Sequence, residues 1–157
     1  ALRCHPGDME RLRSFLRYMI RAIIEDFAPR FAPGSTLVYS SHTADVDATL
    51  LTGLGIAIAS QAQMSDVVLH HAAKNRLLLI ESVASHGPID EPRHAELATL
   101  FAGSTAGLVY VTAFPNRATM ARYLGDIAWE TEVWVADAPS HLIHFNGERF
   151  LGPYRTP

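Results

Sequence analysis

Apolar residues recur every three to four positions in several parts of the chain, a spacing typical of amphipathic helices. The longest such segment covers residues 8–28, and we expect this helix to end at Pro29, because proline interrupts the hydrogen bonds of a helix interior. Three further helices are expected, at residues 45–54, 90–101 and 116–124.

Short apolar runs of the length of buried strands lie between these helices. Strands are expected at residues 35–40, 66–70, 76–83, 106–114 and 127–136, and residues 56–59 are compatible with another short strand. Residues 141–145, followed by Asn146-Gly147, predict a hairpin that returns through residues 149–151. Helices that alternate with buried strands predict one α/β domain, a mixed β-sheet flanked by helices.

Alternation within residues 127–136 places Glu130 and Glu132 on one strand face, where they are expected to be solvated or to line a groove. Trp129 and Trp134 are expected in the core or in an interface rather than as stacking platforms for bases.

Composition agrees with one folded domain. The chain has 157 residues, of which 48% are hydrophobic and 18% charged, which excludes a disordered protein. No segment approaches the roughly 20 apolar residues of a membrane helix, so a membrane partner is not expected. A single cysteine, Cys4, and the lack of a signal segment favour the cytoplasm. The initial Ala1 suggests a trimmed chain or a piece of a longer protein.

Positive charge is concentrated near the beginning of the chain. The net charge is −3, but residues 1–31 hold six arginines against four acidic residues. Arg13, Arg17 and Arg21 are four positions apart and therefore share one helix face. This face either contacts phosphates or is simply a solvated helix surface.

Two acidic residues flank the apolar strands over residues 66–70 and 76–83. If the connecting turn is centred between Ala73 and Lys74, Asp66 lies directly opposite Glu81. Opposed residues point to the same side of a sheet with Cβ atoms about 4.5–5.5 Å apart. The register therefore predicts that the two carboxylates converge.

Converging carboxylates among apolar residues need a neutralising positive charge. Mg²⁺ suits such a pair, because it is bound through one or two carboxylates together with water and substrate phosphates, and Mn²⁺ is a second choice. Alternatively, Asp66 caps the strand entrance and Glu81 pairs with an arginine.

The pair resembles the PD-(D/E)XK nuclease core, in which an Asp and a Glu on adjacent strands bind the metal ion. A lysine two residues after the Glu completes that motif, but Val83 stands at this position. Lys74, which is the only lysine of the chain, falls in the turn at the far end of the hairpin.

A longer resemblance is more specific. The chain is similar, over about residues 15–154, to the BsuBI/PstI family of type II restriction endonucleases. The stretches that carry this similarity are LLLIESVASHGPID (residues 77–90), FAGSTAGLVYVTAFP (residues 101–115), IAWETEVWV (residues 127–135) and HLIHFNG (residues 141–147). The family also tends to have an aliphatic residue where Val83 stands.

The resemblance implies a restriction-endonuclease-like fold and a metal-dependent homodimer that cuts double-stranded DNA at a short palindromic site. A partner methyltransferase of the same restriction-modification system is implied as well. Residues 1–157 correspond to a single nuclease-like domain, the C-terminal half of the longer family proteins, without their N-terminal DNA-binding region.

Asp66 and Glu81 match the acidic positions of the family and are the expected metal ligands and catalytic residues. Ser85 and His86 follow in the next loop, where His86 would orient water or contact phosphate, and His42 would add an imidazole. The alternative for each histidine, an ordinary polar loop residue, is the favoured one. Residues 39–46 depart from the family pattern, which reads closer to Gly-Asp-Thr followed by a basic residue. Here His42 replaces that Asp and Val46 the basic residue.

Three function classes remain open at this stage. The first is an active DNA endonuclease, and the second is a catalytically inactive relative that binds DNA or protein. The third is an oligomerisation module built on the arginine-bearing first helix.

Overall fold

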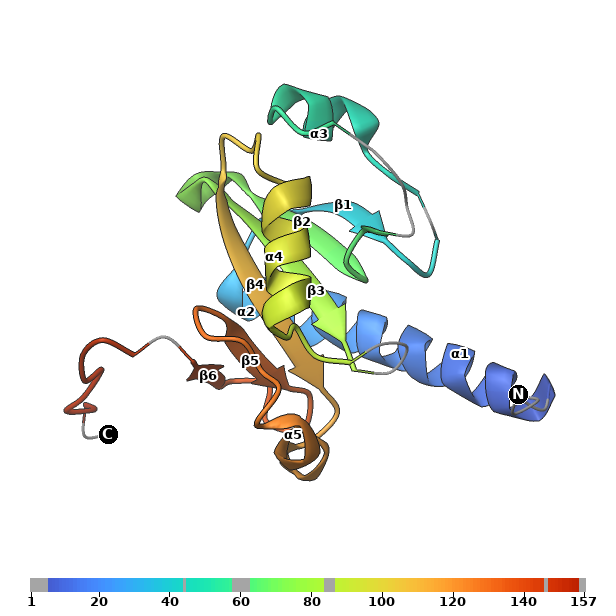
Figure 1. Cartoon of the computed structure of the whole chain (residues 1–157), viewed down its shortest axis with the longest axis vertical. Coiled ribbons are helices and arrows are strands. Elements are labelled where there is room, and N and C mark those ends of the chain that lie inside the picture. Colours follow the sequence, from blue (N-terminus) through green and yellow to red (C-terminus); the bar gives the residue numbers. More distant parts are fainter. Residues whose placement is uncertain (1–5, 44, 58–62, 84–86, 146, 156–157) are drawn as a thin grey trace.

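The chain folds around one mixed sheet, described by a computed structural model for residues 6–43, 45–57, 63–83, 87–145 and 147–155. Within these ranges six strands pair in the order in which they occur in the sequence (Figure 1). They are β1 (Thr36–Ser40), β2 (Val67–His71), β3 (Arg76–Ser82), β4 (Gly107–Phe114), β5 (Glu132–Val135) and β6 (Leu142–His144).

The type of strand pairing changes twice across the sheet. β1, β2 and β3 are antiparallel, β3, β4 and β5 are parallel, and β6 returns antiparallel to β5. The predicted mixed sheet is therefore confirmed. A 3-10 turn, η3 (Ala72–Lys74), joins β2 to β3, so Lys74 does lie at the end of this hairpin.

One face of the sheet is covered by a long broken helix. It consists of α1 (Pro6–Ala22), the π-helical turn η1 (Ile23–Phe27) and α2 (Ala28–Phe31). Phe27 of this helix packs edge-on against Trp134 of β5, with ring centroids 5.6 Å apart. The first part of α1 projects from the body, and Met9 and Leu12 on it are exposed (Figure 1).

The expectation that Pro29 ends the first helix is wrong. The wider η1 turn lets Ala28 N donate to Ile23 O, and a new helical segment then begins at Ala28. Pro29 thus falls in the first turn of α2, a position that tolerates proline.

The opposite face is covered by α3 (Ala48–Gly53) and α4 (Glu91–Leu100), which share a buried cluster with β2 and β3. Asp47 caps α3, which therefore begins later than residue 45, and Asp90 caps α4. A third helix, α5 (Arg117–Tyr123), packs with Phe114 and β5 in a separate apolar cluster and is capped by Asn116, as expected.

Two glycines allow α3 and the end of α4 to approach closely. A Cβ atom on Gly55 or on Gly103 would meet the carbonyl oxygen of the other residue. Gly55 also has φ +85°, a conformation that residues with a side chain rarely adopt. Thr105 N donates to Leu54 O at 2.9 Å beside this contact.

The structure corrects several expectations near the end of the chain. β5 is much shorter than residues 127–136, and Glu130 lies before it with φ +62°, so Glu130 and Glu132 do not share a strand face. Trp134 is fully buried, as expected, whereas Trp129 is 70% exposed and belongs to no core. Residues 149–151 form no return strand, and β6 pairs with β5 alone among the described strands.

Residues 56 and 57 are not part of a strand either, and the remainder of the segment 56–59 lies outside the described residues, as does Cys4. Among the helices that are described, none has both the length and the apolar character needed to cross a membrane.

Candidate active site

The register of β2 and β3 brings Asp66 and Glu81 to adjacent places at one end of the hairpin. Val67 pairs with Ile80 and His70 with Leu77, so the next pair outward is Asp66 with Glu81, as the sequence predicts. Asp66 directly precedes β2, and Glu81 is the penultimate residue of β3. Both residues are buried, with 5% and 1% of their surfaces exposed.

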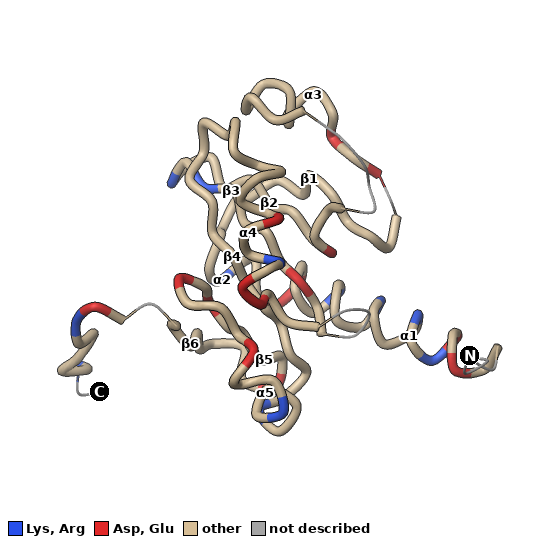
Figure 2. The backbone as a smooth tube through the Cα atoms, in the orientation of Figure 1, with Lys and Arg blue, Asp and Glu red and all other residues tan. Residues whose placement is uncertain are grey.

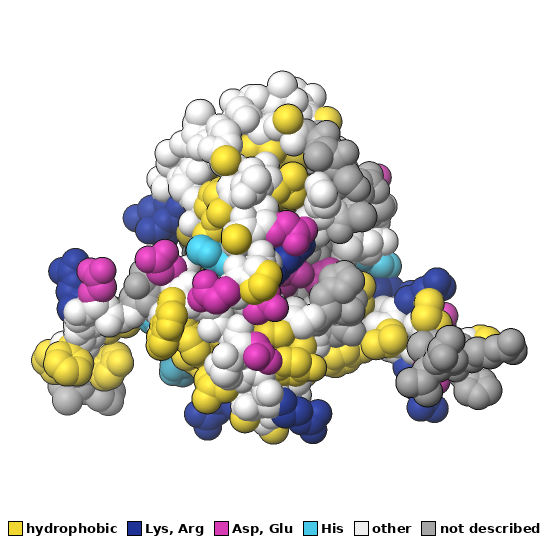
Figure 3. Space-filling view, in the orientation of Figure 1, with side chains coloured by type: hydrophobic (Ala, Val, Ile, Leu, Met, Phe, Trp, Pro, Cys, Tyr) yellow, Lys and Arg dark blue, Asp and Glu magenta, His cyan; other side chains and the backbone are white. Residues whose placement is uncertain are grey.

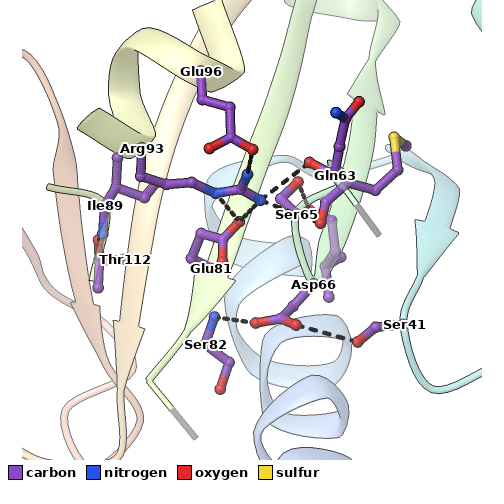
Figure 4. Close-up of polar contacts among 12 residues, drawn as sticks. Ser41, Gln63, Ser65, Asp66, Glu81, Ser82, Ile89, Arg93, Glu96 and Thr112 are labelled. Atoms are coloured by element: carbon purple, nitrogen blue, oxygen red, sulfur yellow. Dashed lines mark hydrogen bonds and ion pairs between the residues drawn. The ribbon is translucent and has the colours of Figure 1, made fainter. Parts of the chain in front are cut away.

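Asp66 joins three segments of the sheet. Its Oδ2 accepts a hydrogen bond from the backbone N of Ser82 at 2.8 Å, and its Oδ1 accepts one from Ser41 Oγ at 3.3 Å (Figure 4). The backbone N of Ser41 also donates to Asp66 O at 2.8 Å. The Asp66 carboxylate is therefore fixed beside the Glu81–Ser82 peptide and close to the turn that follows β1.

Glu81 forms an ion pair with Arg93, which lies in the first turn of α4. Arg93 Nη2 and Nε donate to the same oxygen, Glu81 Oε1, at 2.7 and 3.2 Å (Figure 4). The arginine alternative considered from the sequence is thus realised for Glu81. Within the described residues, the hydrogen bonds to this carboxylate all go to Oε1, which leaves Oε2 for another cation.

Arg93 does not balance the negative charge around it. Burial raises the pKa of Glu81 from its usual value of 4.5 to about 7, with a further contribution from the charge of Asp66. Arg93 lowers this pKa, and Glu96 raises it slightly. Two of the three nearby carboxylates, Glu81 and Glu96, pair with this one guanidinium, and Figure 3 shows acidic side chains gathered over and beside α4. The site therefore still attracts positive charge.

The donor set fits a hard divalent ion that keeps most of its water. The described residues contain no group of three or more His, Cys, Asp or Glu side chains that would enclose a metal ion. Two neighbouring carboxylates, one with an uncommitted oxygen, match Mg²⁺, which takes its other ligands from water and substrate phosphates. They do not match zinc, which needs three or four protein ligands.

The other expected site residues have different outcomes. His42 is exposed in the turn after β1, where its backbone N donates to Ser40 Oγ at 3.2 Å. Ser85 and His86 lie outside the described residues, so their predicted roles stay predictions. Val83 packs in the apolar cluster that also holds Phe114 and β5, which explains why no lysine stands there.

A groove runs from this turn along the first helix. It has a volume of about 480 Å³ and is lined by His42, Thr43 and Ser40 on one side and by Arg17 and Arg21 on the other. Figure 2 shows that basic positions follow one another along α1. Ser41, which bonds to Asp66, belongs to the same turn as His42, although neither carboxylate lines the groove itself.

Sequence reasoning missed Arg93, Ser41 and Ser82 as neighbours of the carboxylates. Arg93 had a recognisable signal, because it is in the first turn of the helix that follows Glu81 and is three residues after the helix cap Asp90. The backbone donor of Ser82 and the hydroxyl of Ser41 had none, because serine is common in loops and at strand ends.

The sheet, the helices on both faces and the carboxylates at neighbouring strand ends define a nuclease-like α/β domain of the restriction endonuclease class. The sequence pattern of the BsuBI/PstI restriction endonuclease domain matches residues 16–148. The chain belongs to this family, and the resemblance noted from its sequence is confirmed.

Individual relatives agree with this assignment. The type II restriction enzyme BsuBI of Bacillus subtilis is 64% identical over 140 residues, which are 87% of this chain and 44% of that protein. The type II restriction enzyme AplI of Arthrospira platensis is 31% identical over 144 residues, which are 85% of this chain and 44% of that protein. The chain thus spans less than half the length of these curated relatives.

A solved structure shows the same fold. The SdaI restriction endonuclease superposes with a TM-score of 0.81 and 44% sequence identity. The superposition covers 90% of this chain and 46% of that chain. The expected restriction-endonuclease-like fold is therefore confirmed.

Proposed function

We propose that this chain is the catalytic part of a divalent-metal-dependent endonuclease that hydrolyses phosphodiester bonds of double-stranded DNA at a short palindromic site. The observation that carries the proposal is that Asp66 and Glu81 lie side by side at the same end of the β2–β3 hairpin, in a chain of a restriction endonuclease family. Relatives that are named type II restriction enzymes support the same reaction.

Asp66 and Glu81 would hold Mg²⁺, or Mn²⁺, through one carboxylate oxygen or more from each side chain. When bound, the ion supplies Lewis-acid polarisation of a phosphate oxygen and lowers the pKa of a water molecule. Ser82 N and Ser41 Oγ keep the Asp66 carboxylate in place while the phosphate is engaged. Glu81 must lose its proton to act as a ligand, so ion binding is favoured above about pH 7.

The DNA backbone would follow the groove between α1 and the turn after β1. Arg17 and Arg21 provide positive charge there, and His42 provides a ring at the end nearest Asp66. Arginines on one helix face bind phosphates through counterion release without reading the sequence. In this arrangement His42 contacts the DNA backbone, and no transfer of a proton needs to be assigned to it.

The proposal extends to a homodimer, because a palindromic site presents the same half-site to two copies related by a two-fold axis. It also extends to a methyltransferase that protects the same site in the host, with no direct contact between the two enzymes. Sedimentation of the full-length protein at micromolar concentration would show a dimer, and a persistent monomer on a palindromic duplex would contradict this part.

A second candidate is an inactive relative that binds DNA without cutting it. One observation favours it, namely the Arg93–Glu81 ion pair, which already neutralises part of the carboxylate charge. Its prediction differs clearly from that of the enzyme, because metal ions would change neither the DNA products nor the stability of the protein.

Asp66→Ala separates the two candidates. Full-length parent protein is expected to cleave plasmid DNA in Mg²⁺ and to stop in EDTA, whereas Asp66→Ala binds the same DNA and leaves it intact. Asp126→Ala is the matched control, because Asp126 is exposed and lies beyond α5. Equal cleavage by the parent and Asp66→Ala would remove the metal site from the function.

A further inference from the structure

Hydrogen bonds of the residues just before α4 fix the start of this helix to the sheet. Asp90 Oδ1 accepts a hydrogen bond from Arg93 N at 2.9 Å and so caps the helix. One residue earlier, Ile89 N donates to Thr112 Oγ1 of β4 at 3.1 Å, and Ala128 N donates to Ile89 O at 2.9 Å. The Arg93 backbone therefore has a defined position relative to β3 and β4.

The guanidinium group of Arg93 donates to four acceptor oxygens. Besides the two bonds to Glu81 Oε1, its Nη1 donates to Glu96 Oε1 at 2.8 Å (Figure 4). Its Nη2 also donates to the backbone carbonyl oxygens of Gln63 at 3.2 Å and Met64 at 3.3 Å. Only 19% of the Arg93 side chain is exposed.

These acceptors lie on both of the chain segments that carry the carboxylate pair. Gln63 and Met64 are three and two residues before Asp66, whereas Glu81 is on the neighbouring strand. The pairing of β2 with β3 begins at Val67, and Ser41 N donates to Asp66 O just before it, so residues 63 and 64 lie outside these strand contacts. Arg93 binds the carbonyl groups of these two residues and holds Glu81 with the same planar group.

We propose that Arg93 is a positioning residue of the metal site, whose guanidinium fixes the spacing of Asp66 and Glu81 so that one ion can bind both. The inference rests on the proposed function, since it assumes that these carboxylates bind a divalent ion. Arg93 acts through Glu81 Oε1 and the two carbonyl groups, and it leaves Glu81 Oε2 for the ion.

Simple electrostatics makes the opposite prediction. A fixed positive charge beside two carboxylates repels a divalent cation, so an arginine that acts only through its charge weakens metal binding. Lysine separates the two effects, because it keeps the charge but replaces the planar fork of five donors by a single ammonium group. One ammonium nitrogen cannot reach Glu81, Glu96 and two carbonyl groups with the geometry of the fork.

The test is the affinity for Mn²⁺ without DNA, measured by calorimetry on the full-length protein. Arg93→Lys is expected to weaken Mn²⁺ binding at least tenfold and to lower kcat at saturating Mn²⁺, with little change in KM for DNA. Arg117→Lys is the matched control, because Arg117 is exposed in the first turn of α5. Parent-like Mn²⁺ affinity in a folded Arg93→Lys protein would overturn the inference.

A second comparison applies even if Arg93→Lys does not fold. Glu96→Gln loosens the Arg93 side chain, whereas Glu91→Gln removes the same charge from an exposed position of the same helix. Glu96→Gln is expected to weaken Mn²⁺ binding several-fold more than Glu91→Gln does. Equal affinities in the two variants would mean that the Arg93–Glu96 ion pair does not support the metal site, and would overturn the positioning role.

Asp66→Ala distinguishes failure of this inference from failure of the proposed function. If Asp66→Ala keeps parent-like Mn²⁺ binding and cleavage, the metal site itself is wrong. If Asp66→Ala loses both while Arg93→Lys keeps both, the metal site stands and the role of Arg93 is wrong.

Discussion

Replacing Glu81 by glutamine tests the electrostatics of the carboxylate pair without a metal ion or DNA. Glu81 is almost fully buried, and burial together with the Asp66 charge raises its pKa from 4.5 to about 7. The folded protein therefore keeps a proton on Glu81 at a pH where the unfolded chain has lost it. This difference makes the stability of the metal-free protein depend on pH.

The sign and size of the effect follow from the two pKa values. Below pH 4.5 the group is protonated in both states, and its favourable contribution is fully present. Between about pH 4.5 and about pH 7 the unfolded chain has released this proton while the folded protein keeps it, so the free energy of unfolding falls by about 1.4 kcal/mol per pH unit and by about 3 kcal/mol in total. Above about pH 7 this loss of stability is complete.

The assay is urea unfolding in EDTA, followed by tryptophan fluorescence at several pH values between about 5 and about 8. Glu81→Gln has no proton to lose, and its amide oxygen still accepts from Arg93. We expect it to be more stable than the parent near pH 8 by about 3 kcal/mol, and the advantage to shrink towards pH 5. Subtracting the two curves removes the shared effect of the histidines. Parallel curves would refute the raised pKa of Glu81.

Three further outcomes are expected, each with its own control. Arg21→Gln should weaken DNA binding and reduce the slope of log affinity against log salt concentration by about 1. The control Arg122→Gln on α5 should leave this slope unchanged. Equal slopes in the two variants would exclude α1 from the DNA path. Gly103→Ala should lower the free energy of unfolding by about 1–3 kcal/mol, because its Cβ atom would clash with the carbonyl oxygen of Gly55. In the control Gly125→Ala the new Cβ atom meets open space, so no such loss is expected. Equal losses would contradict the close approach of α3 and α4. Mg²⁺ should raise the melting temperature of the parent but not of Asp66→Asn, and a rise in both would place the ion elsewhere.

The sequence predicted the carboxylate pair because the pair depends on local information. The turn after His71 is short, and the apolar runs on either side leave only one register that buries both strands. Once that register is fixed, Asp66 must face Glu81. No distant contact is needed for this conclusion, and it is the one on which the proposed function depends.

Predictions failed where a distant contact decides the local structure. Alternation in residues 127–136 favoured one long strand, but only four residues find partners on β4 and β6, and Glu130 takes a positive φ before the strand begins. The prediction of a helix end at Pro29 fails for a local reason, because a pattern of apolar residues does not show the π-helical turn that precedes it. In residues 127–136, by contrast, tertiary structure overrides a correct periodicity.

From the sequence, an arginine and a metal ion were competing explanations of the same two acids, because either one neutralises buried charge. The structure makes them compatible. Arg93 binds a single oxygen of Glu81, while Glu96 joins the cluster and restores the negative charge that Arg93 removes. A pair of carboxylates neutralised only by arginine would need no uncommitted oxygen and no third acid. The surplus of negative charge around Arg93 is therefore the physical reason to expect a second, exchangeable cation at this end of the sheet.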